Sequence, residues 1–381
     1  MQLWQIIKRE FRQIFLEDPR RFVFLFGAAV GYLFIFGALY SPNIVKYIPL
    51  IVYDEEQSPL SRELIRDFDS SDSFRVTAYA ATQEEMQQAL ADKSAYAAID
   101  IPRDFSRKIK QGGASSLLFM VNGSNIVITN ITSSAAQDIT AAFSDKVAAE
   151  RAALRTGQNQ EKLGKRLAPV SAHLRVLNNP TQGYMLFFLL GLAMAAFQQG
   201  IFFSVGASVQ AEYLKREAIS WRSLLLGKFI TYWGLAMLSF LTVVLIAEFF
   251  WEIWLKGSMV QLLLLGGVFS FAFIAFSMLM SSLFHNEMQF VRASILYPVP
   301  AFIFAGYTWP QESLGPVMHL VSYFFPMAWF SNAVRQIFTA GQAAHFTENI
   351  AVLLLLGTGF VVLASLVFRH RQKQLLAADE K

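Results

Sequence analysis

The segment Phe22–Tyr40 reads FVFLFGAAVGYLFIFGALY and contains no charged residue. A bilayer core of about 30 Å needs about 20 apolar residues per helix, so this segment predicts a transmembrane helix. A polar stretch, residues 41–183, follows it, and five further apolar segments crowd into the second half of the chain. These segments are Tyr184–Val209, Phe229–Phe250, Gln261–Phe284, Phe290–Tyr307 and Ile350–Phe368. The spacing predicts a polytopic α-helical membrane protein with six transmembrane helices and a large domain inserted after the first.

The composition agrees with a membrane protein. Of the 381 residues, 54% are hydrophobic and 16% are charged, whereas soluble domains carry about 25% charged residues. The formal net charge is +4, but the basic residues are spread out or flank the apolar segments, which argues for orientation signals and against a nucleic-acid partner. The chain contains no cysteine, which excludes disulfides, thiolate metal sites and thiol catalysis.

Lysine and arginine are unevenly distributed beside the predicted spans. They are dense in residues 1–21, 210–228 and 369–381. The alternate short loops hold only Lys256 and Arg335. Because positive residues mark cytoplasmic loops, both termini are predicted in the cytoplasm and residues 41–183 outside it. The first span lacks a cleavage pattern and is interpreted as a signal anchor.

Residues 1–21 contain an amphipathic pattern. Apolar side chains recur at helical spacing over residues 3–16, with Lys8, Arg9 and Arg12 between them. This pattern predicts a helix lying in the cytoplasmic membrane interface. The alternative is a short solvated lead-in to the first span.

Residues 41–183 alternate short apolar runs with helical patterns. Ser58 and Pro59 suit the cap and first position of a helix, and Thr82 with Glu85 forms a capping box. From about residue 126 to 167 the pattern is helical and returns the chain to the membrane. The segment therefore predicts a single extracytoplasmic α/β domain.

The loop 210–228 is polar, dense in charge and favourable to a helix. Its charged residues include Glu212, Lys215, Arg216, Glu217 and Arg222. Two interpretations are open, a docking surface for a cytoplasmic partner and an ordinary positive-inside loop.

Residues 308–345 are outside the membrane by the predicted topology, yet they are strongly apolar. Pro310, Pro316 and Pro326 divide them into pieces too short to span a bilayer. We expect re-entrant or interfacial helices buried against protein. A seventh span is the alternative, but it would place the basic residues 369–373 outside and break the charge rule.

The sequence lacks the patterns of energy-coupled chemistry. Lys228 follows Gly227 but precedes Phe229, so the phosphate-binding loop pattern is absent, and the five histidines show no metal-ligand spacing. No catalytic constellation supports a membrane enzyme. If the chain moves a substrate, the energy is therefore expected from another protein.

Several stretches carry a resemblance to a known family. They are residues 4–21 (WQIIKREFRQIFLEDPRR), residues 48–66, Ile101–Ser106, Asn122–Asn125 and residues 302–341. In this order and spacing the chain resembles the permease subunit of type-2 ATP-binding-cassette exporters, in the branch with a large extracytoplasmic domain between the first two transmembrane helices. The sequence Lys215-Arg216-Glu217-Ala218-Ile219 departs from the Glu-Arg-Glu-Gly-Thr-like start of the family's coupling helix.

The resemblance implies two functional regions. The ATPase-coupling residues would be Glu212, Lys215, Arg216, Glu217 and Arg222. The external gate would contain Gly306, Tyr307, Trp309, Pro310, Pro316, Pro326 and Arg335.

The resemblance also implies a function: alternating access would move a hydrophobic drug-like or lipid-like substrate outward across the bacterial inner membrane. The chain itself would bind no cofactor, and ATP with Mg²⁺ would bind a separate cytoplasmic ATPase. A second permease, identical or a sister chain, would complete the membrane part, and a periplasmic adaptor is the further partner implied in Gram-negative relatives. The alternative is a membrane-anchored scaffold or receptor whose external domain binds a partner without transport.

Overall fold

The computed structural model describes residues 3–41, 45–156, 178–179, 183–215 and 220–379. The chain divides into two compact units. One comprises Met1–Asn43 with Leu177–Lys381, and the other comprises Ile44–Val176. The second unit therefore interrupts the first in sequence, where the spacing of apolar segments predicts an inserted domain.

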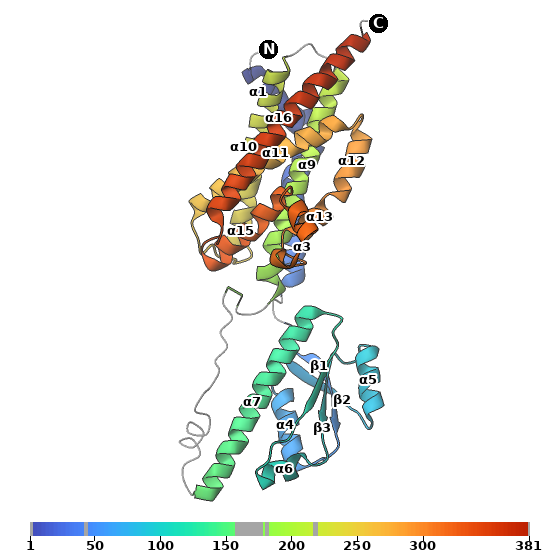
Figure 1. The fold of residues 1–381 in the computed structure, drawn as a ribbon, viewed down its shortest axis with the longest axis vertical. Helices are drawn as coiled ribbons and strands as arrows, with labels where there is room; N and C mark the ends of the chain where they lie inside the picture. Colours follow the sequence, from blue (N-terminus) through green and yellow to red (C-terminus); the bar gives the residue numbers. More distant parts are fainter. Residues whose placement is uncertain (1–2, 42–44, 157–177, 180–182, 216–219, 380–381) are drawn as a thin grey trace. The chain divides into compact units, whose positions relative to one another are not determined.

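The first unit is helical, and α1 lies at the same end of it as the C-terminal end of α16 (Figure 1). Its elements in chain order are α1 (Leu3–Arg12), the π-helical stretch η1 (Gln13–Glu17), α2 (Arg20–Phe22), the π-helical stretch η2 (Val23–Gly27), α3 (Ala28–Tyr40), the π-helical stretch η3 (Met185–Leu189), α9 (Leu190–Lys215), α10 (Trp221–Phe249), α11 (Met259–Leu283), α12 (Glu287–Leu296), α13 (Pro298–Phe304), the 3-10 turn η4 (Gln311–Ser313), α14 (Pro316–Ser322), α15 (Pro326–Ala340) and α16 (Phe346–Asp379).

Within the described residues, five helical stretches are long and apolar enough to cross a membrane. They are Arg20–Tyr40, Met185–Tyr213, Trp221–Phe249, Met259–Leu283 and Phe346–Gln372. They match five of the six predicted spans, so the chain is a polytopic membrane protein.

The segment predicted as the fifth span, Phe290–Tyr307, is not one regular helix. It is divided into α12 and α13 beside Pro298, which lacks the N–H that would continue the helical ladder. The sixth crossing therefore stays a prediction.

The predicted loop 210–228 is shorter than the sequence suggested. The helix α9 continues to Lys215 and α10 begins at Trp221, eight residues before the predicted start of the span at Phe229. Polar and charged residues at the ends of a span lower its average hydrophobicity there, although the helix itself continues.

The helix α9 packs closely against the start of the first span. A Cβ placed on Gly200 would lie 2.4 Å from the carbonyl oxygen of Phe24, so only glycine permits this approach. Ser204 Oγ donates to the carbonyl of Arg21, and Ser239 Oγ of α10 donates to that of Leu25, each over 2.7 Å. Buried hydroxyls thus satisfy carbonyls where the π-helical stretch η2 disturbs the regular ladder.

The second unit is an α/β domain. Its elements are β1 (Ile48–Asp54), α4 (Pro59–Asp69), β2 (Phe74–Tyr79), α5 (Gln83–Ala91), β3 (Ala97–Ile101), α6 (Phe105–Gln111), β4 (Leu118–Val121) and α7 (Ile126–Thr156). The strand order is β2-β1-β3-β4, with β1 parallel to β2 and β3, and β4 antiparallel to β3. The helices α4, α6 and α7 cover one face of the sheet and α5 covers the other (Figure 1).

The predicted helix starts in this domain are confirmed. Ser58 Oγ accepts from the Ser61 amide over 3.0 Å, and Pro59 is the first residue of α4. Thr82 Oγ1 accepts from the Glu85 amide over 3.2 Å, while the Glu85 carboxylate accepts from the amide of Ala81. Both caps satisfy amides that the helix itself leaves unpaired.

Candidate functional site

The helix α1 and the π-helical stretch η1 that continues it turn a mixed face toward the rest of the first unit. Ile6, Glu10 and Ile14, spaced four residues apart, are buried, whereas Phe11 and Phe15 are exposed. This arrangement fits a helix at a membrane interface, where aromatic side chains face lipid and the opposite side contacts protein. It also places a carboxylate, Glu10, inside the helical bundle.

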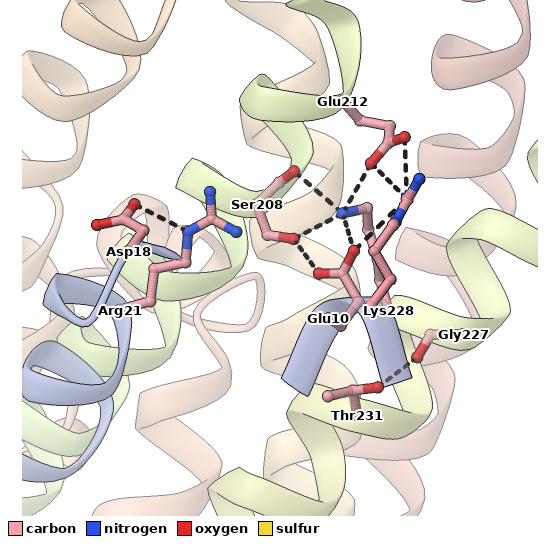
Figure 2. A network of polar contacts seen from close by, with 9 residues as sticks. Glu10, Asp18, Arg21, Ser208, Glu212, Gly227, Lys228 and Thr231 are labelled. Carbon is pink, nitrogen blue, oxygen red and sulfur yellow. Dashed lines mark hydrogen bonds and ion pairs between the residues drawn. The ribbon is translucent and has the colours of Figure 1, made fainter. Parts of the chain in front are cut away.

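Lys228, on the second turn of α10, lies beside this carboxylate. Its Nζ donates to Glu10 Oε1 over 2.7 Å, to Ser208 Oγ over 2.8 Å and to the Ser208 carbonyl over 3.2 Å. The same nitrogen is 3.1 Å from Glu212 Oε2. Figure 2 shows Lys228 surrounded by these three side chains, which come from α1 and α9.

Arg9 completes the group. Its Nη2 donates to both oxygens of Glu212, over 3.0 and 2.8 Å, and Ser208 Oγ donates to Glu10 Oε2 over 2.8 Å. The group contains two cations and two carboxylates, so its formal charge is balanced. We call Arg9, Glu10, Ser208, Glu212 and Lys228 the Lys228 cluster.

Electrostatics keeps Glu10 ionised despite its burial. Desolvation alone would raise the pKa of Glu10, but the charge and hydrogen bond of Lys228, the hydrogen bond from Ser208 and the charge of Arg9 outweigh it. The result is a pKa below the ordinary value of 4.5. A buried ion pair adds little net stability over apolar packing, but removing one partner is costly. The cluster therefore fixes how α1, α9 and α10 are placed.

A glycine lets α1 lie against α10 at this point. A Cβ placed on Gly227 would be 2.6 Å from Ile6 Cγ2. The close contact brings Glu10, one turn after Ile6, within reach of Lys228. The Lys228 cluster consequently ties α1 to the ends of both helices that border residues 216–219, a segment outside the described residues.

The predicted coupling residues have different positions. Glu212 is buried in the Lys228 cluster instead of forming an exposed surface. Arg222 is exposed on the first turn of α10, with its guanidinium 5.3 Å from the centre of the Trp221 ring. The side chain of Lys215 and the residues Arg216 and Glu217 lie outside what the structure describes. The role of these residues in coupling stays a prediction.

Sequence reasoning missed Arg9, Glu10, Ser208 and Lys228 as members of one site. Two features of the sequence point to the site. The first is that Glu10 is spaced four residues from both Ile6 and Ile14, so it lies on the same face of the helix as these apolar residues. A lysine at position 228 borders a long apolar segment, where an unpaired charge would be costly. The pairing itself depends on contacts about 200 residues apart in sequence, as with Lys228 and Glu10, which no local pattern reveals.

Part of the predicted gate forms a second group. Gly306 has a φ of +80°, which favours glycine, and the next residue, Tyr307, is buried. Tyr307 Oη donates to the carbonyl of Ser331 over 3.2 Å. The guanidinium carbon of Arg335 lies 4.6 Å from the centre of the Tyr307 ring. The structure thus brings Gly306, Tyr307 and Arg335 together.

The other predicted gate residues shape the surrounding turns. Trp309 is 55% exposed and donates its Nε1 hydrogen to the Ser313 carbonyl. Pro310 precedes η4, while Pro316 and Pro326 are the first residues of α14 and α15. The prolines therefore divide this region into short helices, as predicted. The expectation that these helices are buried against protein holds for α15 but is wrong for α14 within this chain, where Val317, Met318 and Leu320 are 67%, 51% and 64% exposed. Its role as a gate stays a prediction.

The described residues contain no group of three or more histidine, cysteine, aspartate or glutamate side chains placed to hold a metal ion.

A comparison with protein families finds that residues 20–366 match the model described as "ABC-2 family transporter protein". The chain belongs to the ABC-2 transporter family. This membership makes it a permease of the ATP-binding-cassette type, and it implies a cytoplasmic ATPase partner and dimerisation.

Two curated relatives agree. The "Probable multidrug ABC transporter permease YbhR" of Escherichia coli strain K12 is 22% identical over 361 residues, which cover 91% of this chain and 92% of the relative. The "Probable multidrug ABC transporter permease YbhS" of the same strain is 25% identical over 158 residues, or 41% of this chain and 40% of the relative. The family resemblance inferred from the sequence is therefore confirmed.

Proposed function

We propose that this permease exports a hydrophobic drug-like or lipid-like substrate by alternating access, driven by ATP and Mg²⁺ on a separate cytoplasmic ATPase. Both termini face the cytoplasm in this proposal, and residues 41–183 lie outside the inner membrane. The uneven distribution of lysine and arginine supports this orientation. The names of the two relatives support a drug-like substrate.

The Lys228 cluster is the observation that carries the proposal. It joins α1, α9 and α10 through buried, charge-balanced contacts. An ATPase bound at residues 210–228 would move the adjoining ends of α9 and α10 when it closes on ATP. Breaking the cluster would leave buried charges unpaired, so α1 moves with the two helices. The cluster thereby couples the interfacial helix to the ATPase.

Two partners follow in this proposal. A second permease, identical or a sister chain, pairs with this one in the membrane, and a periplasmic adaptor contacts the inserted α/β domain. The scaffold or receptor function is the competing proposal, because the same domain would serve it equally well.

Affinity purification of the full chain from its native membrane in mild detergent, followed by mass spectrometry, tests the function. A stoichiometric ATP-binding-cassette ATPase is the expected result, and a second permease beside it would identify a heterodimer. Recovery of a partner on residues 41–183 without any ATPase would contradict the export function and favour the scaffold.

A further inference from the structure

A cavity with a mixed polar and apolar lining lies in the region predicted as the gate. Its volume is about 470 Å³, within the range of small-molecule sites, and Arg335, Asn332, Gln336 and Thr339 of α15 line it. Leu186 and Phe187 of η3 also line it and supply an apolar wall. The cavity therefore combines one cationic side chain, one carboxylate (Glu312), several hydrogen-bonding groups and an apolar surface.

Arg335 is held in a corner of aromatic rings. Its guanidinium carbon lies 4.4 Å from the centre of the Phe187 ring and 4.6 Å from that of Tyr307. The two ring centres are only 5.8 Å apart, so the rings cover adjacent sides of the guanidinium and do not sandwich it. Cation–π contacts thus orient Arg335 and leave another side of the group without a ring.

The charge of Arg335 has no counterpart among the described residues. Nη2 donates to Asn332 Oδ1 over 2.8 Å, and the buried Nη1 has no hydrogen-bond partner in the described part of the chain. Glu312 also lines the cavity, but it forms no ion pair with Arg335 within 4.0 Å. Arg335 is partly exposed and lines the cavity, and no carboxylate of the described residues lies within 4.0 Å to balance its charge. The site therefore favours a negatively charged ligand, which would pair with the guanidinium through charge-assisted hydrogen bonds.

We propose that Arg335 binds a carboxylate or phosphate group of the transported amphiphile. Guanidinium pairs with both groups in a planar, two-pronged geometry. The amides of Asn332 and Gln336 supply further hydrogen bonds, and the wall of Leu186 and Phe187 receives apolar atoms next to the charged group. This inference rests on the proposed export function, because it names the substrate class of that function.

Binding to the full-length chain in phosphatidylcholine nanodiscs tests the proposal, with empty nanodiscs correcting for partition into lipid. The probes are dodecyl phosphate, inorganic phosphate and the cation dodecyltrimethylammonium, measured by microscale thermophoresis. We expect wild type to bind dodecyl phosphate at least about tenfold more tightly than the cation, as charge-assisted hydrogen bonds imply. Equal affinity for the two amphiphiles would overturn the proposal, whatever the behaviour of any variant.

Variants locate the site. Arg335→Gln is expected to weaken dodecyl phosphate binding about tenfold or more. Arg335→Lys should weaken it less, because lysine keeps the positive charge but loses the two-pronged hydrogen bonding of the guanidinium. Arg292→Gln, which removes an exposed arginine of α12, should leave the affinity unchanged. Unchanged affinity in folded Arg335→Gln would refute the assignment. If inorganic phosphate binds as tightly as dodecyl phosphate, the ligand is a free anion and not an amphiphile. If inorganic phosphate binds much more weakly than dodecyl phosphate, the ligand is an amphiphile. These measurements need no ATPase, so they can fail independently of the export function.

Discussion

Lys228 Nζ lies 2.7 Å from Glu10 Oε1, and the two side chains are 1% and 0% exposed. Removing either charge alone leaves the buried Lys228 cluster, which holds two cations and two carboxylates, with an unbalanced charge. Lys228→Met or Glu10→Gln alone is therefore expected to lower the free energy of unfolding by about 3–5 kcal/mol. The double variant restores charge balance and should recover much of the loss. Unfolding by SDS titration in mixed micelles measures all three.

An exposed ion pair on the same segment is the matched control. Arg12 and Glu17 pair at 3.3 Å, but their side chains are 73% and 52% exposed. Replacing either by glutamine should change the stability by less than about 1 kcal/mol, because solvent screens such pairs. Similar losses in the buried and exposed pairs would show that the Lys228 cluster does not hold α1 in place.

The stability that Glu10 contributes should depend on pH in one direction. The pKa of native Glu10 lies below the ordinary value of 4.5. The carboxylate is therefore charged in both native and unfolded chains above that pH, and its contribution is fully present there. As the pH falls through the native pKa, Glu10 takes up a proton and the contribution is lost.

The difference in unfolding free energy between wild type and Glu10→Gln measures this dependence. It should be constant between about pH 7.5 and about pH 5.5 and shrink only at more acid pH. A difference that already falls across the first interval would mean that burial raises the pKa of Glu10 in the native protein.

Gly227 makes the close contact between α1 and α10 possible, and Gly227→Ala should disturb it. The added Cβ would lie 2.6 Å from Ile6 Cγ2, so we expect a loss of about 1–3 kcal/mol from overpacking. Gly234→Ala on the same helix is the control, because nothing lies within 4 Å of its added Cβ. That variant should be neutral or more stable by up to about 1 kcal/mol. Thermal unfolding in detergent compares them, and equal effects would argue against a tight contact at Ile6.

The sequence predicted those elements whose signal is local. Five of the six predicted spans have an apolar run that forms one long helix, and the capped helices at Ser58 and Thr82 have their own start signals, so local patterns predict these elements. The sequence predicts the first and last residues of the spans less accurately. Trp221 and Arg222 belong to α10, although their polar groups suggested a loop. Pro298 divides the segment Phe290–Tyr307 into α12 and α13, which the apolar composition of the segment does not indicate.

The sites were predicted less completely, because they depend on long-range contacts. The sequence predicts Glu212 as a coupling residue of the loop 210–228, but it gives no sign of the partners Arg9 and Lys228, which lie on other elements. Tyr307 and Arg335 were predicted together through the family resemblance, and their contact is present. The buried position of Glu212 shows that charge in a predicted loop does not establish exposure.

The basic residues of the predicted coupling loop provide a test of ATPase docking. Lys215 and Arg216 lie in the predicted coupling loop, and a basic segment binds an acidic partner surface through complementary charge. Reversing both, with Lys215→Glu and Arg216→Glu, should weaken binding of the ATPase at least about tenfold and abolish substrate-stimulated ATP hydrolysis, since like charges across an interface cost several kcal/mol. Lys256→Glu reverses a charge in the loop between α10 and α11, on the opposite side by the predicted topology, and should leave both quantities unchanged. Gel filtration and protease accessibility check that the variants insert normally. If the doubly reversed variant stimulates the ATPase as strongly as wild type does, the docking surface lies elsewhere. Arg222, on the first turn of α10, is then the next residue to change.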